Sequence, residues 1–362
     1  MTMETERRLT YRLDSFSEGG SNVILRQIER EDRVRIEDIR NVSVIGAGFM
    51  GHGIGLTYAM HGYRVALNDV NKTMLANAMS HISDELRALA ENELISPDMI
   101  KTILSRITTT IDFKEAVKDA DFVTEAVCED IAVKQKLFRD LDMVCPKHTI
   151  LASNTSALLL GDIAAYCQRK DKVVITHWVN PPHLVPLVEV VGSEDTSTAT
   201  IELAYNLLKK LNKVPVKIRR EIPGLILNRL QAALIREAWS LWQQGIANAE
   251  DIDLVMKASL GFRWAAIGPL ETADLGGLDL FYQLMDQLFK VISDSHEPPE
   301  ELKKMIADGK LGLKSGQGFF EYDVSYFKDG EAARVKDRDR KHIQLLKLWY
   351  SKGRTDKPRK MV

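Results

Sequence analysis

The stretch VSVIGAGFMG, residues 42–51, decides how the chain is expected to fold. Its first four residues are rich in β-branched, apolar side chains, which is typical of a short buried strand. Glycines then follow with the spacing G-x-G-x-x-G, and apolar residues at helical spacing continue to about Met60. The stretch therefore predicts a strand, a tight glycine turn and a helix in direct succession.

This glycine turn has the pattern of a dinucleotide-binding site. The first glycine makes the turn, the second lets the backbone approach a pyrophosphate, and the third lets helix and strand pack closely. The start of the following helix offers free N–H groups and a positive dipole to the phosphates. The candidate cofactor-binding residues of the turn are Gly46, Gly48, Phe49, Met50 and Gly51.

Asp69 is the second part of the predicted cofactor site. It follows the apolar run at residues 65–67, at the distance of about twenty residues where such sites carry an acidic residue. A carboxylate there accepts hydrogen bonds from the ribose hydroxyls and repels a 2′-phosphate, and Val70 rather than an arginine comes next. We therefore expect NAD rather than NADP. The alternative is that Asp69 only caps the helix that begins near Lys72.

Short apolar runs alternate with helical periods over the first two thirds of the chain. The strand candidates are residues 42–45, 65–67, 108–111, 122–127, 149–152, 173–176, 187–191 and 214–218. Strands that alternate with helices predict an α/β, Rossmann-type doubly wound domain with a parallel sheet, here residues 41–219. After Pro223 only helical periods continue, which predicts an all-α C-terminal domain over residues 220–325. Residues 1–40 and 326–362 are interpreted as a charged N-terminal extension and a charged tail.

The bulk composition limits the partners and the location. A net charge of −2 gives no electrostatic reason to expect nucleic acid or an anionic membrane. No apolar run reaches the ~18 residues of a membrane span, and the N-terminus lacks the apolar core of a secretory signal. Cys128, Cys145 and Cys167 are not spaced as a metal site, and we expect buried, reduced thiols. The predictions are a cytoplasmic protein, a small-molecule substrate and no metal.

Polar residues stand at the ends of three strand candidates. They are the run ASNTS at residues 152–156, His177 and Glu189. Ligands of open α/β sheets bind at the carboxyl ends of the strands. Oxidation of an alcohol needs a base for the hydroxyl proton, and a histidine held by a carboxylate suits that task. The alternative is that His177 is a core histidine and Glu189 a surface charge.

Several segments together resemble the L-3-hydroxyacyl-CoA dehydrogenase family. They are residues 46–51, 125–129 with Lys134, 152–156, 177–181, 187–191, 223–230 and 312–319, in family order. The resemblance implies that His177 is the catalytic base and that Glu189 orients it. It also implies that Ser156 and Asn228 contact the substrate oxygen.

The same resemblance implies the remaining site residues and the assembly. Glu129, Lys134 and Asn154 fall on positions at the cofactor, and Asn180 on a position that supports the substrate site. The implied reaction is NAD-dependent oxidation of a 3-hydroxyacyl-CoA, such as 3-hydroxybutyryl-CoA, to the 3-keto product in fatty acid metabolism. The implied assembly is a homodimer formed through the C-terminal helical domain.

The sequence departs from the acyl-CoA pattern where phosphate-binding lysines are expected. Pro186 replaces a lysine, and Glu91 and Glu93 place negative charge near the expected phosphates. In this respect the chain looks closer to relatives that oxidise free hydroxy acids, such as gulonate 3-dehydrogenase of the lambda-crystallin group, carnitine dehydrogenase and a pyridine-aldehyde dehydrogenase. Arg263 would then be the candidate anchor for a substrate carboxylate, although a plain surface arginine is the commoner outcome.

Two functions of other classes remain as alternatives. One is a non-catalytic, crystallin-like NAD-binding protein, and the other is a lyase that uses the same pocket without NAD. The complete set His177, Glu189, Ser156 and Asn228 disfavours the first. The intact glycine turn and Asp69 disfavour the second.

Overall fold

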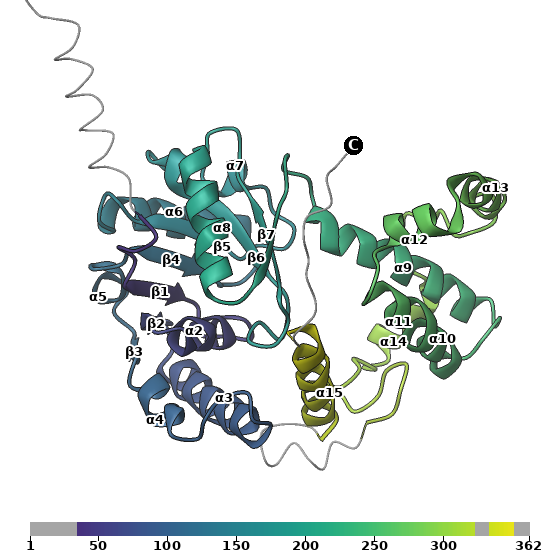
Figure 1. The fold of residues 1–362 in the computed structure, drawn as a ribbon, viewed down its shortest axis with the longest axis horizontal. Helices are drawn as coiled ribbons and strands as arrows, with labels where there is room; N and C mark the ends of the chain where they lie inside the picture. Colours follow the sequence, from purple (N-terminus) through teal and green to yellow (C-terminus); the bar gives the residue numbers. More distant parts are fainter. Residues whose placement is uncertain (1–34, 323–332, 351–362) are drawn as a thin grey trace, which may run out of the picture. The chain divides into compact units, whose positions relative to one another are not determined.

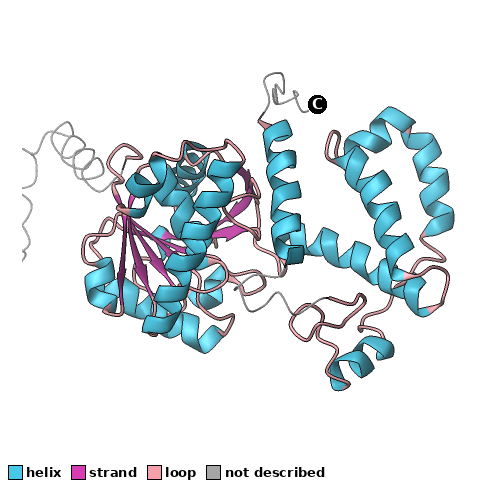
Figure 2. Cartoon of the chain, turned by 90° about the horizontal axis from the view of Figure 1, so that it is seen from below, coloured by secondary structure: helices cyan, strands magenta, loops and turns pink. Residues whose placement is uncertain are grey.

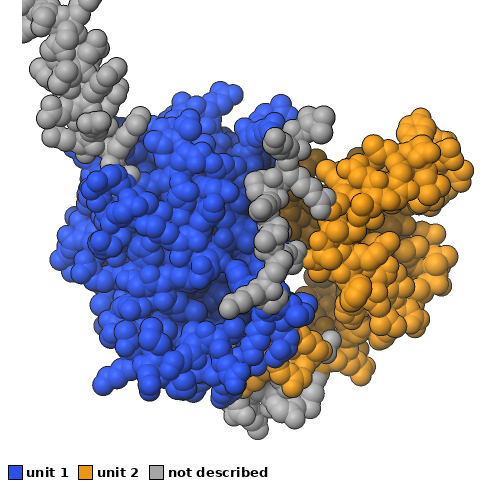
Figure 3. Space-filling view, viewed as in Figure 1, with its two compact units in different colours: residues 1–225, 342–362 blue, residues 226–341 orange. Residues whose placement is uncertain are grey.

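The computed structural model describes residues 35–322 and 333–350. The chain divides into two compact units, residues 1–225 with 342–362 and residues 226–341 (Figure 3). Most of the predicted N-terminal extension and parts of the predicted tail lie outside the described residues.

The first unit is built on one eight-stranded sheet with the strand order β3-β2-β1-β4-β5-β6-β7-β8 (Figure 1). The strands are β1 Asn41–Ile45, β2 Arg64–Asn68, β3 Ile107–Thr110, β4 Phe122–Glu125, β5 Ile150–Ser153, β6 Val173–Trp178, β7 Leu187–Val191 and β8 Val214–Lys217. The chain starts in the middle of the sheet, builds to one edge through β3, and returns to build the other half from β4. This order confirms the predicted Rossmann-type, doubly wound fold.

One part of the sheet prediction was wrong, because the sheet is not wholly parallel. Strand β7 runs antiparallel to β6, while every other neighbouring pair is parallel. Only residues 179–186 connect β6 to β7. A parallel return needs a crossover of a dozen or more residues, so this short connection forces the strand to reverse.

Helices cover both faces of the sheet (Figure 2). The helices α2 (Gly51–Met60), α3 (Lys72–Glu91) and α8 (Thr198–Lys210) bury their apolar sides in one core cluster. The helices α5 (Phe113–Val117), α6 (Ile131–Val144) and α7 (Leu160–Ile163) do so on the opposite face. The short α4 (Met99–Leu104) precedes β3. Because both faces are covered, strands such as β4 and β6 are buried along their whole length.

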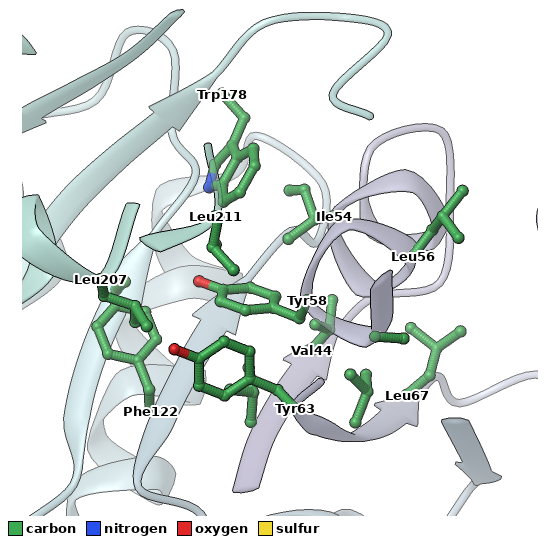
Figure 4. Packing of buried hydrophobic residues seen from close by; sticks show 14 of the residues in the cluster. Val44, Ile54, Leu56, Tyr58, Tyr63, Leu67, Phe122, Trp178, Leu207 and Leu211 are labelled. Atoms are coloured by element: carbon green, nitrogen blue, oxygen red, sulfur yellow. The ribbon is translucent and has the colours of Figure 1, made fainter. Parts of the chain in front are cut away.

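Aromatic packing in the first cluster fixes the end of β6 (Figure 4). The ring of Tyr58 contacts Trp178 at 5.9 Å and Phe122 at 6.4 Å between centroids. Its hydroxyl lies 3.2 Å from Thr124 Oγ1. Because Trp178 directly follows His177 and is buried, this packing limits the freedom of the candidate catalytic strand.

The second unit is helical, as predicted. Its helices are α9 (Leu225–Gln243), whose first residue belongs to the first unit, α10 (Ala249–Val255), α11 (Gly261–Trp264), α12 (Pro269–Gly276), α13 (Leu278–Leu288) and α14 (Glu300–Ala307), with a π-helical turn at Met256–Leu260. Many of its large apolar side chains are exposed, among them Phe262, Leu270, Tyr282 and Val291. This unit therefore has little apolar core of its own.

Part of the predicted charged tail forms the helix α15 (Ala333–Trp349). In the part of this helix that belongs to the first unit, Ile343 is buried against Leu89 of α3 and Leu184 of the 179–186 connection. The Tyr350 hydroxyl donates a hydrogen bond to the Asn212 carbonyl oxygen. The tail thus contributes packing to the first unit in addition to charge.

The structure also tests the expectations for membrane spans and for the cysteines. None of the helices in the described ranges is long and apolar enough to cross a membrane. Cys145 and Cys167 are buried, and burial raises the pKa of their thiols to about 12 and about 11. The expectation of a buried thiol was wrong for Cys128, which is exposed because it lies in the loop after β4.

Candidate active site

The glycine turn joins β1 to α2 at the carboxyl edge of the sheet. Gly46 has a φ of +98°, and a Cβ there would lie 2.5 Å from the Ala126 carbonyl oxygen. A Cβ on Gly51 would lie 1.7 Å from the Gly46 carbonyl oxygen, so only glycine fits at both places. By contrast, a Cβ on Gly48 would meet no atom within 4 Å. The middle glycine therefore faces open space, as a close approach by a pyrophosphate requires.

Neighbouring residues of the turn are accessible as well. Phe49 is 71% exposed, and Met50 is the N-cap residue of α2. The first turn of a helix leaves backbone N–H groups without intrahelical acceptors. The turn can therefore offer donors to phosphate oxygens.

Asp69 is tied to the glycine turn at the end of β2. Its carboxylate accepts hydrogen bonds from Ala47 N at 2.9 Å and from Asn71 N at 3.0 Å. The N-cap of α3 is Asn71, whose side chain accepts from Thr73 N. The alternative reading of Asp69 as the helix cap is thus excluded. The carboxylate stands beside the turn, where it can meet ribose hydroxyls.

Glu129 lies in the loop between β4 and α6, beside the carboxyl end of β5. It accepts hydrogen bonds from Thr155 Oγ1 at 2.5 Å, Ser156 N at 2.8 Å and Ala157 N at 3.1 Å. Partial burial opposes its ionisation, but the Thr155 hydrogen bond, the Lys134 charge and these N–H groups outweigh burial and lower the pKa of Glu129. Glu129 is therefore a fixed carboxylate that positions the backbone of Ser156.

Lys134 of α6 is buried next to this loop. Its side chain is 1% exposed, and its ammonium lies 2.5 Å from Glu125 Oε1 and 3.2 Å from Glu129 Oε2. Glu125, at the end of β4, also accepts from Ser153 Oγ at 2.6 Å and Val127 N at 2.8 Å. A lysine buried to this degree bonds protein atoms, so its effect on the cofactor site passes through Glu129. Glu125 was not among the predicted site residues, and its place at the end of a buried strand was the available signal.

Asn154 links the ends of β5 and β6. Its side-chain oxygen accepts a hydrogen bond from Trp178 N at 2.8 Å, and its backbone N–H donates to the Glu125 carbonyl oxygen at 2.8 Å. Asn154 therefore holds the turn that carries Ser156 against the strand that carries His177. Its side-chain NH₂ group has no hydrogen-bond partner among the described residues and can donate to a ligand.

His177 and Glu189 lie directly opposite each other in the antiparallel pair β6–β7. His177 Nδ1 is 2.8 Å from Glu189 Oε2, and the two side chains are 5% and 2% exposed. The alternative that Glu189 is a surface charge is thus excluded. A carboxylate at Nδ1 fixes the tautomer that carries its proton there, which leaves Nε2 with a free lone pair. This geometry suits a general base.

The 179–186 connection carries Asn180 and contacts residues that the sequence analysis did not assign to the site. Glu85 of α3 lies 3.0 Å from His52 Nε2 and 3.5 Å from His183 Nδ1. His52, in the first turn of α2, is largely buried: its side chain is 13% exposed and its Nδ1 lies 2.8 Å from the Gly48 carbonyl oxygen. The α2–α3 contact buries this part of the helix, which a single-helix pattern does not reveal.

Asn228 and Arg263 belong to the second unit, and the other candidate residues belong to the first. Asn228 lies near the start of α9 and lines a hollow together with Arg229 and Arg236 of the same helix. Arg263 is exposed on α11. In the described ranges, no group of three or more histidine, cysteine, aspartate or glutamate side chains is arranged to hold a metal ion.

Comparison with known proteins follows the same division of the chain. The NAD binding domain of 3-hydroxyacyl-CoA dehydrogenase matches residues 41–222, and the C-terminal domain of that enzyme matches residues 224–322. The human mitochondrial hydroxyacyl-coenzyme A dehydrogenase is 36% identical over 291 residues, which cover 78% of this chain and 91% of the relative. The human lambda-crystallin homolog is 36% identical over 270 residues, which cover 74% of this chain and 85% of the relative.

A solved structure gives a similar result. The crystal structure of 5-formyl-3-hydroxy-2-methylpyridine 4-carboxylic acid 5-dehydrogenase, described as an NAD⁺-dependent dismutase, superimposes with a TM-score of 0.79 at 30% identity. The match covers 86% of this chain and 98% of that one. Proteins named for coenzyme A thioesters and a protein named for a free carboxylic acid are thus similar to this chain.

Proposed function

The chain belongs to the 3-hydroxyacyl-CoA dehydrogenase family, and on that premise we propose that it oxidises a 3-hydroxy substrate to the 3-keto product with His177 as the catalytic base. The observation that carries the proposal is the buried His177–Glu189 pair at 2.8 Å. In this proposal Nε2 of His177 takes the hydroxyl proton, and Glu189 stabilises the imidazolium that forms. The glycine turn and Asp69 would hold NAD, which would supply the hydride acceptor for this oxidation.

The other candidate residues have supporting roles in this proposal. Ser156 and Asn228 donate hydrogen bonds to the substrate oxygen, where negative charge develops as the proton leaves. Glu129 holds the backbone of Ser156 in place through its 2.8 Å hydrogen bond. Asp69 and the glycine turn hold the cofactor, and they do not contact the reacting atoms.

Of the two substrate classes, we propose a free hydroxy acid rather than a coenzyme A thioester. Glu91 and Glu93 are exposed at the end of α3, so they put negative charge where the nucleotide phosphates of a thioester are expected. The nearby Leu89 is covered by Ile343 of α15. A charge-assisted contact contributes ~1.5–3 kcal/mol, so losing one weakens binding by ~10- to 10²-fold.

Three basic residues of α15 already pair with acidic residues of the same helix. Arg340 and Lys341 pair with Asp337, and Arg338 pairs with Asp339. Arg263 is the proposed anchor for the substrate carboxylate. The thioester alternative would need other cations, such as Lys101 of α4.

The test is NADH formation with 3-hydroxybutyryl-CoA, free 3-hydroxybutyrate, gulonate and carnitine, compared by kcat/KM. We expect at least one free acid to exceed the thioester. A clear preference for the thioester with no free acid oxidised would reject the free-acid proposal and leave the acyl-CoA reaction standing. No NADH from any substrate in the panel would favour the non-catalytic, crystallin-like alternative.

We also propose a homodimer that forms through the helical unit. Phe262, Leu270, Tyr282 and Val291 are each between 74% and 84% exposed, far more apolar surface than a small helical unit usually leaves in water. Sedimentation velocity should give a mass about twice 40.8 kDa. A monomer at micromolar concentration would contradict this proposal.

A further inference from the structure

The connection between the two candidate catalytic strands is held by a lysine that no catalytic role explains. Lys213 immediately precedes β8, which pairs with β7. Its amino group donates hydrogen bonds to the carbonyl oxygens of Pro182 at 2.5 Å and Val185 at 2.9 Å. Both acceptors lie within residues 179–186, the segment that joins His177 to Glu189.

The surroundings of Lys213 are unusual for a lysine. The residue is 8% exposed, and within the described part of the chain no carboxylate pairs with it. Its Nζ lies 5.5 Å from the centre of the Trp178 ring, the residue after His177. Burying an ionisable group without a counter-ion costs stability. Burial accordingly lowers the pKa of Lys213 to about 7.

An apolar side chain would be expected at a site whose only task is packing. Lysine instead supplies two N–H donors to two carbonyl oxygens of the same connection. Val214 N adds a third contact to the same segment, because it donates to the Pro186 carbonyl oxygen at 2.8 Å. The two residues before and at the start of β8 thus fix three carbonyl groups of one connection.

The rest of this connection is also fixed, so its conformation is specific. A Cβ on Gly53 of α2 would lie 2.8 Å from Pro182 Cγ, which shows how closely the helix packs on it. Leu184 is buried against Leu89 and Ile343. The length and turn of a connection set the register of the strands that it joins, and a slip of one residue would turn Glu189 to the other face of the sheet.

From these contacts we infer that Lys213 is a positioning residue of the dehydrogenase site: through the 182 and 185 carbonyls it holds His177 opposite Glu189 and sets the place of Asn180. Lys213 touches neither substrate nor cofactor in this inference. The inference rests on the proposed catalytic role of His177.

The test compares Lys213→Met, just before β8, with the matched control Lys217→Met at the end of β8. Lys217 is partly exposed and pairs with Glu202 on the surface. Each preparation is titrated with NADH, and turnover of the best substrate in the panel is expressed per NADH-binding site. A misplacement of catalytic groups by about 1 Å costs up to ~10²-fold. We expect Lys213→Met to lose about tenfold or more in turnover per site with unchanged NADH affinity, and Lys217→Met to match the wild type.

If Lys213 only stabilises the fold, Lys213→Met should have fewer NADH-binding sites and a lower melting temperature but unchanged turnover per site. That result would overturn the inference. If Lys213→Met does not fold, Lys213→Arg decides the matter. Its guanidinium keeps the charge and the donors, but it is larger and planar, so in this buried place it must displace the 182 and 185 carbonyl groups. Turnover per site should then fall with NADH affinity retained, and wild-type turnover would refute the inference. His177→Gln is the separate test of the proposed function, so failure of one is distinguishable from failure of the other.

Discussion

The two halves of the sheet differ in the kind of group that they offer to ligands. In the half β3-β2-β1-β4, all strand pairs are parallel, and the ligand-binding features are mostly backbone: the glycine turn, the start of α2 and one partly exposed carboxylate, Asp69. In the half β5-β6-β7-β8, the last two strands, β7 and β8, run opposite to the others, and the features are buried side chains: His177, Glu189 and Lys213.

This difference fits the roles proposed for the two halves. A pyrophosphate needs several N–H donors and close access, which glycines and a helix start provide without side chains. A proton transfer needs one ring nitrogen held in one tautomer, which requires a buried partner. Reversal at β7 places Glu189 beside His177 on the same face, at 2.8 Å. The comparison predicts that substitutions in the first half change cofactor affinity, whereas substitutions in the second half change turnover.

Replacing His177 by Gln should have the largest effect on the catalytic half. Turnover should fall by roughly 10²–10⁴-fold, the usual range for loss of a general base. NADH affinity should barely change, because the imidazole is not part of the pyrophosphate site. Steady-state NADH formation measures turnover, and a fluorescence titration with NADH measures affinity. Near-normal turnover would contradict the assignment of His177 as the catalytic base.

Glu189→Gln should have a smaller effect on the same half. The amide keeps the shape but no longer stabilises the imidazolium, so we expect a loss of roughly 10–10³-fold. Combined with His177→Gln it should add little, because the two residues act as one unit. Full additivity in the double variant would show that Glu189 acts independently of His177.

On the cofactor half, Asp69 should make the wild-type protein prefer NADH over NADPH by about tenfold or more, since a 2′-phosphate beside a carboxylate meets like-charge repulsion. Titration of the same preparation with both nucleotides checks this. Asp69→Ala is the matched variant and should reduce the difference between the NADH and NADPH affinities. Equal or tighter NADPH binding by the wild type would contradict the role given to Asp69.

The smallest predicted effect is a pH dependence of stability from Lys213. Its pKa falls from 10.5 to about 7 because it is buried. Below pH 7 the cost of burying the charge is fully present; between pH 7 and 10.5 the unfolded chain holds a proton that the folded chain lacks, so the free energy of unfolding rises with pH. The rise is at most ~1.4 kcal/mol per pH unit.

Urea unfolding between pH 7 and 8.5 is the measurement for this effect. The upper limit avoids the thiols of Cys145 and Cys167, whose raised pKa values lower stability at higher pH. The slope of the wild type minus that of Lys213→Met isolates the lysine. Parallel slopes in the two proteins would show that Lys213 titrates as an ordinary surface lysine.

Much of the cofactor half could be predicted from sequence because its signals are local. The glycine spacing, the strand before it and Asp69 about twenty residues later lie within one strand–helix–strand unit. The structure adds what local patterns omit. Asn71 rather than Asp69 caps α3, and His52 is covered by Glu85, which lies on another helix.

The catalytic half was harder to predict because its contacts join distant segments. The positions of all strands were predicted, but the reversal of β7 depends on the shortness of the 179–186 connection, which an alternating strand–helix pattern does not weigh. The role of Lys213 depends on carbonyl groups about thirty residues earlier in the chain. A lone lysine between a helix and a strand carries no local signal for such a contact.

The most direct test of this separation is to measure NADH affinity and turnover at saturating NAD for His177→Gln and Asp69→Ala side by side. The account predicts that His177→Gln keeps the wild-type Kd for NADH and loses turnover, whereas Asp69→Ala weakens the Kd and keeps most of the turnover. Loss of NADH binding in His177→Gln, or loss of saturated turnover in Asp69→Ala as large as in His177→Gln, would contradict the central claim that one half of the sheet binds and the other performs the proton transfer.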